Sequence, residues 1–160
     1  MKRVIPTGMP TIELPRLRDD IQRGYEALRS ERLGILTPLQ LKRLQEIRLP
    51  LQHLSVAVDE FVAAFQLAPD ARSFEPRARL TYAAAVPLEM ILRCSYFLQM
   101  SHMRNQETLN PDQREAVWLI ERSGRRLIIE VEHLWRSMKA EQETAPSTKS
   151  VHFPNMDANP

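Results

Sequence analysis

The segment from Leu109 to Lys139 constrains the fold of this chain more than any other feature. It opens with Asn110, Pro111 and Gln113, which match a helix N-cap, a first helical position and a capping-box residue. Positions that recur at steps of three or four then form one stripe: Ala116, Ile120, Ser123, Leu127, Val131, Leu134 and Met138. The stripe predicts a helix of roughly 45 Å that needs partners of similar length to cover it.

A first partner helix is predicted to begin at Arg16. Leu17, Ile21 and Leu28 follow helical spacing, and Gly34 is suited to the left-handed residue that ends a helix. The residues before Arg16 contain three prolines and a Thr-Gly pair, which is typical of an extended arm.

Two longer helices are predicted between this one and the last. The second starts at a capping box made by Thr37 and Gln40, and its apolar stripe keeps its phase across Pro50, which predicts one bent helix. The third runs from Ser73 to about Met103, and Pro87 predicts a second bend. Short links favour antiparallel neighbours.

Together these segments predict an all-α protein, an antiparallel four-helix bundle over residues 16–140. Residues 1–15 are expected to form an extended arm. Residues 141–160 are rich in Pro, Ser, Thr and Asn, so we expect a disordered tail.

The composition restricts the expected partners and cellular location of the protein but does not indicate a function. The chain has 160 residues, 22 Lys and Arg, 20 Asp and Glu, and a net charge of +2, which does not by itself indicate a nucleic-acid or membrane partner. A single cysteine, Cys94, excludes an intrachain disulfide and favours a reducing compartment. No signal peptide and no membrane span are recognised, so a cytoplasmic location is expected.

Catalytic and cofactor motifs are not found. The glycines are too scattered for a phosphate loop, and Cys94 is interpreted as a small packing residue. Glu130 and His133 have the spacing of a bundle-bound di-iron ligand pair, but neither His53 nor His102 repeats it. We therefore expect a protein without enzymatic activity, metal or cofactor.

Two groups of arginines are candidate contacts for nucleic acid or a protein partner. The first lies in the first predicted helix and the second in the last: Arg16, Arg18, Arg23, Arg29 and Arg32, and Arg122, Arg125 and Arg126. The alternative for the first group is a solvated face paired with the acidic residues beside it.

Glu89 and Gly124 are candidate helix or subunit contacts. Glu89 is either a partly buried carboxylate or one half of an exposed pair with Arg93. Gly124 lies inside a helix, where glycine costs about 1 kcal/mol relative to alanine, which indicates a close approach.

One stretch, residues 80–135, contains four short motifs: Ala83-x-x-Val86-x-x-Glu89, Leu109-x-Pro111-x-Gln113, Leu119-Ile120-Glu121 and Gly124-Arg125-Arg126-Leu127. Through these motifs the stretch resembles a known family of four-helix bundles. The family comprises the proteins of ribosomal-RNA intervening sequences and the accessory variability protein of diversity-generating retroelements. The stretch departs from the family where Val86 replaces serine, Ser123 replaces isoleucine and Arg126 is added.

The resemblance implies a homo-oligomeric ring, pentameric in this family, without enzymatic activity. For the retroelement branch it implies binding to a reverse transcriptase and its RNA or single-stranded DNA. Our first hypothesis is therefore a self-associating accessory protein that docks a nucleoprotein through its arginine-rich faces. The alternative is a protein–protein adaptor or immunity-type bundle with no nucleic-acid role.

Overall fold

The computed structural model describes residues 10–67, 74–100 and 108–144, and these residues form four helices and no strand. The helices are α1 (Pro10–Arg29), α2 (Pro38–Leu67), α3 (Phe74–Met100) and α4 (Pro111–Thr144). The predicted all-α class is confirmed for the described residues.

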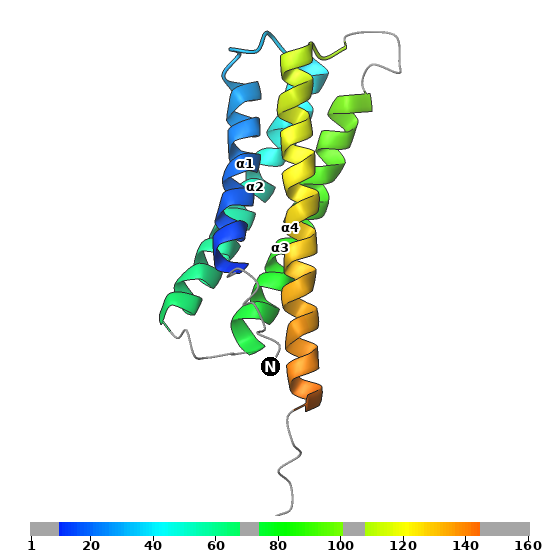
Figure 1. Ribbon diagram of the computed structural model, residues 1–160. Coiled ribbons are helices and arrows are strands. Elements are labelled where there is room, and N and C mark those ends of the chain that lie inside the picture. Colours follow the sequence, from blue (N-terminus) through cyan, green and yellow to red (C-terminus); the bar gives the residue numbers. More distant parts are fainter. Residues whose placement is uncertain (1–9, 68–73, 101–107, 145–160) are drawn as a thin grey trace, which may run out of the picture.

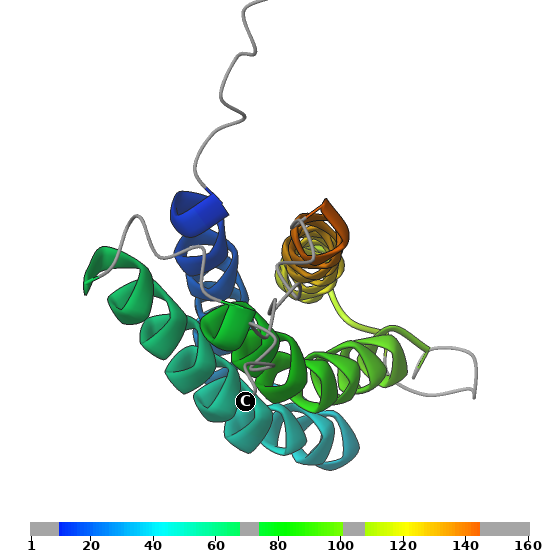
Figure 2. The same cartoon turned by 90° about the horizontal axis from the view of Figure 1, so that it is seen from below.

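Helices that are neighbours in sequence run in opposite directions (Figure 1). α1 packs on α2, α2 on α3, α3 on α4, and α4 closes the ring by packing on α1. The view from below shows α2 and α3 as a close pair, with α1 and α4 on one side of it (Figure 2). This up-down arrangement is the predicted antiparallel four-helix bundle.

The stripe that predicted the last helix lies in the core. All seven of its positions, from Ala116 to Met138, are buried, and Ile120 and Leu127 are 0 % exposed. They pack against the buried face of α1, which includes Leu14 and Ile21, and against α3. The longest helix is thus held along one side by two antiparallel neighbours.

The predicted extended arm, residues 1–15, is too long. α1 begins at Pro10, so residues 10–15 are helical. Pro10 suits the first helical position, while Pro15 removes one backbone hydrogen bond inside the helix. The fully buried Leu14 supplies the packing that outweighs this loss. Residues 1–9 lie outside the described part of the chain.

The boundary of the predicted tail is also wrong by four residues. α4 continues to Thr144 because its last turns still have a partner, as Glu141 accepts a hydrogen bond from Arg77 of α3 at 3.2 Å. Tyr82 of α3 packs edge-on against Trp135 of α4 nearby. The remaining tail, residues 145–160, lies outside the described residues.

Both predicted capping boxes are confirmed, and the second one has an additional role. Asn110 Oδ1 accepts from the Gln113 amide at 2.8 Å, and Gln113 Oε1 accepts from the Asn110 amide at 3.0 Å. The remaining side-chain NH2 groups donate to the α1–α2 loop, from Asn110 to the Leu33 carbonyl and from Gln113 to the Gly34 carbonyl. The start of α4 therefore anchors the loop that follows α1.

The predicted role of Gly34 at the end of α1 is wrong. α1 ends at Arg29, and the first residue after it with a positive φ is Glu31, at 58°. Gly34 also has a positive φ, of 109°, but it lies in the loop, where a Cβ would be 3.0 Å from the side-chain nitrogen Nδ2 of Asn110. Its backbone conformation therefore serves the contact with α4.

α2 and α3 each continue through an internal proline. Pro50 and Pro87 lie inside these helices, and both helices curve along their length in Figure 2. The prediction of one bent helix at Pro50 is confirmed. α3 ends at Met100, and residues 101–103 of its predicted range lie outside the described part of the chain.

Two glycines mark close approaches to neighbouring helices, and they differ in what they face. A Cβ on Gly24 of α1 would lie 2.8 Å from the Ala116 carbonyl oxygen and 2.7 Å from Ile120 Cγ1 of α4. A Cβ on Gly124 of α4 would meet only the flexible end of Leu92 on α3, at 3.0 Å. The predicted close approach at Gly124 is therefore a contact within the bundle.

These two glycines provide a matched test of the packing. We expect Gly24→Ala to lower the free energy of unfolding by about 1–3 kcal/mol, because the Ala116 carbonyl cannot move without shifting α4. Gly124→Ala should change it by less than about 1 kcal/mol, since Leu92 can adjust and alanine favours the helix. Urea unfolding followed by circular dichroism measures both, and equal stabilities would contradict the close α1–α4 contact.

Candidate interaction surfaces

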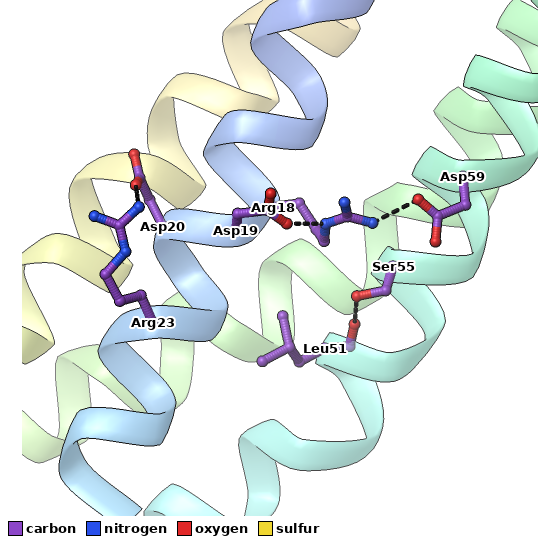
Figure 3. Close-up of polar contacts among 7 residues, drawn as sticks. All are labelled: Arg18, Asp19, Asp20, Arg23, Leu51, Ser55 and Asp59. Carbon is purple, nitrogen blue, oxygen red and sulfur yellow. Dashed lines mark hydrogen bonds and ion pairs between the residues drawn. The ribbon is translucent and has the colours of Figure 1, made fainter.

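Arg18 of α1 connects two helices of the bundle. Its guanidinium lies 2.6 Å from Asp59 of α2 and 2.7 Å from Asp19 on its own helix (Figure 3). The side chain is only 17 % exposed. Burial lowers the pKa of Arg18, but the hydrogen bonds to Asp59 and Asp19 outweigh it and raise the pKa overall. Arg18 is therefore placed to stabilise the α1–α2 contact.

The other arginines of α1 pair along their own helix. Arg16 pairs with Glu13, Arg23 with Asp20 and Arg29 with Glu26, in each case with the acidic residue three positions earlier. Figure 3 shows Arg23 beside Asp20 on the side of α1 away from the Arg18 bridge. In the described chain Arg32 forms no ion pair.

The positive charges of the first arginine group are matched by nearby carboxylates. Between residues 10 and 32 the sequence holds five arginines and five Asp or Glu residues. A phosphate or acidic protein that binds there has to compete with carboxylates already in place. The geometry therefore favours the paired, solvated face over a basic contact surface.

Of the three candidate contact arginines on α4, two are likewise paired. Arg125 lies 2.6 Å from Glu121, which also accepts a hydrogen bond from Gln99 of α3, so this pair helps to join the two helices. Arg126 lies 2.8 Å from Glu130. Glu130, one half of the candidate metal-ligand pair, is thus engaged by an arginine.

Arg122 differs from its neighbours on α4. Its guanidinium carbon lies 4.5 Å from the centre of the Trp118 ring, a cation–π contact, and Trp118 is 47 % exposed. No ion pair holds Arg122 within the described residues. Trp118 and Arg122 thus form an exposed aromatic and cationic pair on the outer face of α4.

The partly buried position considered for Glu89 is wrong, since Glu89 is exposed on α3. The described ion pairs do not join it to Arg93 either. The Arg93 guanidinium lies instead over the Phe97 ring, 6.0 Å from its centre. Both charges are therefore available on the outer face of this helix.

An exposed apolar surface on α3 was not predicted from the sequence. Five large apolar or aromatic side chains of α3 are exposed: Tyr82, Val86, Met90, Tyr96 and Phe97. Val86 and Met90 line a groove of about 470 Å³ together with Pro50 and Val56 of α2. The signal available in the sequence is that apolar residues lie on both sides of α3.

Cys94 lies in the core, as predicted for a packing residue. Its Sγ donates a weak hydrogen bond to Glu46 Oε2 at 3.8 Å. Burial raises the pKa of the Cys94 thiol, and the Glu46 carboxylate raises it further, so the nucleophilic thiolate is disfavoured at neutral pH.

Comparison with known proteins does not assign the chain to a family. No family model, no curated protein and no solved structure matches the chain. Within the described segments, no group of three or more His, Cys, Asp or Glu side chains is arranged to hold a metal ion. The same segments contain no helix long and apolar enough to cross a membrane.

Arg18 and Arg16 on α1 allow a matched test of whether a bridging arginine stabilises the fold more than an exposed one. We expect Arg18→Met to lower the free energy of unfolding by about 1 kcal/mol, because the α1–α2 bridge is lost and Asp59 and Asp19 lose their partner. Arg16→Met, at a 63 % exposed side chain, should change it by no more than about 0.5 kcal/mol. Urea unfolding measures both, and equal effects would contradict a bridging role for Arg18.

Proposed function

We propose that this protein is a non-enzymatic helical-bundle accessory protein that self-associates and docks a protein partner through exposed apolar faces. The observation that carries the proposal is the outer face of α3, where five large apolar or aromatic side chains lie exposed together. Several large apolar side chains exposed on one helix face are typical of an interaction site.

The ion pairs of the arginines favour docking through apolar faces over docking through a basic surface. Arg16, Arg18, Arg23, Arg29, Arg125 and Arg126 each have a carboxylate partner. Because ion-paired arginines contribute little net positive potential, a partner that recognises shape and apolar area fits these surfaces better than a polyanion.

Self-association is tested by light scattering after size-exclusion chromatography across a concentration series. We expect a mass above the 18.6 kDa of one chain, rising with concentration. Val86→Ser should lower this mass because it removes exposed apolar area from α3. Ile129→Ser, on an exposed residue of α4, is the matched control. A strict monomer at every concentration would contradict the proposal.

A second candidate function is supported by the Trp118–Arg122 pair. An exposed indole can stack on a base while an adjacent guanidinium contacts phosphate. The candidate is an accessory protein of a nucleoprotein, which for the family it resembles implies a reverse transcriptase with its RNA or single-stranded DNA.

Single-stranded RNA binding at several salt concentrations tests this second candidate. We expect Arg122→Gln to weaken binding and to reduce the slope of log K against log salt by about 1. Arg136→Gln is the control, because Arg136 is paired with Glu132 on the same helix. No detectable binding at low salt would exclude the nucleic-acid role and leave the protein–protein proposal in place.

A further inference from the structure

The outer face of α3 carries a second stripe, on the side opposite its core residues. Its positions alternate in steps of four and three: Tyr82, Val86, Glu89, Arg93, Tyr96 and Met100. Tyr82 is 73 % exposed, Val86 66 % and Tyr96 51 %. Glu89 and Arg93 are exposed, and Met100 is half-buried. This spacing is the heptad pattern of a helix that packs along another helix.

The stripe is symmetric about residue 91. Tyr82 and Met100 lie nine residues on either side of Ile91, Val86 and Tyr96 lie five, and Glu89 and Arg93 lie two. A second copy of α3 can pack antiparallel on the outer face, about a two-fold axis at the level of residue 91. This places each position opposite the other member of its pair. Every layer then matches, with tyrosine against methionine, valine against tyrosine, and glutamate against arginine.

We propose that this stripe is an isologous contact between two copies of the chain, with Glu89 of each copy against Arg93 of the other. The inference rests on the self-association in the proposed function and specifies its surface and register. It is a closed two-fold contact, in contrast to the ring that the family resemblance implies.

Charge complementarity selects the antiparallel orientation. In a parallel pair, Glu89 would face Glu89 and Arg93 would face Arg93, which is unfavourable. In the antiparallel pair both contacts are between opposite charges. Neither residue takes part in an ion pair among the described residues, so both charges are available to the second copy.

The flank of the stripe beside α2 is also suited to this contact. Met90 lines the groove with Pro50 and Val56, and Phe97 lies beneath Arg43 of α2, 5.1 Å from ring centre to guanidinium carbon. A two-fold axis perpendicular to α3 brings this apolar flank of one copy against the same flank of the other. The contact therefore buries apolar area on both sides of the charged layer.

A charge swap tests the register. By sedimentation equilibrium, we expect Glu89→Arg and Arg93→Glu each to weaken dimerisation at least about tenfold, since like charges then meet twice per dimer. The double variant with both changes should return to within about threefold of the wild-type dissociation constant, because opposite charges face each other again. Glu132→Arg, an exposed charge reversal on α4, is the control, and circular dichroism confirms folding.

The sedimentation results distinguish a failure of this interface from a failure of the proposed self-association. A wild-type protein that stays monomeric contradicts both. An oligomer that ignores the single charge reversals, or that the double variant fails to restore, contradicts this interface alone.

Disulfide trapping gives a second measurement of the same register. In a Cys94→Ala background, a mixture of Val86→Cys and Tyr96→Cys proteins should form a cross-linked dimer on mild oxidation. Each variant alone should not, because its two cysteines would lie about 15 Å apart along the helix axis, beyond disulfide reach. Cross-linking of either variant alone, or none in the mixture, would overturn the proposed register.

Discussion

The close approach of α1 to α4 at Gly24 is the contact on which the arrangement of this bundle depends. A Cβ at this position would meet the Ala116 carbonyl and Ile120 on α4, so only glycine allows the two helices to lie this close. The approach places the buried face of α1 against the stripe of α4. α2 and α3 then cover the remaining core faces, and the capping amides of Asn110 and Gln113 hold the α1–α2 loop at the start of α4.

The charged surface follows from the same arrangement. Arg18 has a partner on α2 because α1 and α2 are adjacent, and Arg125 shares Glu121 with Gln99 because α3 and α4 are adjacent. The other paired candidate arginines, Arg16, Arg23, Arg29 and Arg126, pair along their own helix and stay exposed, so they contribute little to the packing of the helices. Arg122, stacked on Trp118, differs because no carboxylate neutralises it in the described chain.

α3 has two apolar faces with different roles. Leu80, Leu88 and Ile91 lie in the core, whereas Tyr82, Val86 and Tyr96 are exposed on the opposite side. A helix that is apolar on both sides usually has neighbours on both sides. The bundle buries one side of α3 and covers the other only in part, with Trp135 beside Tyr82 and Arg43 over Phe97. This partly covered face is the basis for the proposal that the protein acts through association.

Local spacing and end signals determined much of the fold. The phase of the α4 stripe, both capping boxes and the continuity of α2 through Pro50 all depend on residues close in sequence, and all were predicted. The start of α1 was missed because long-range packing of Leu14 outweighs a local proline. The bridge from Arg18 to Asp59, the neighbour of Gly124 and the exposure of Glu89 depend on which helices lie side by side. Periodicity also cannot tell which of two apolar faces of α3 is buried, so only the tertiary structure decided which surface is left for a partner.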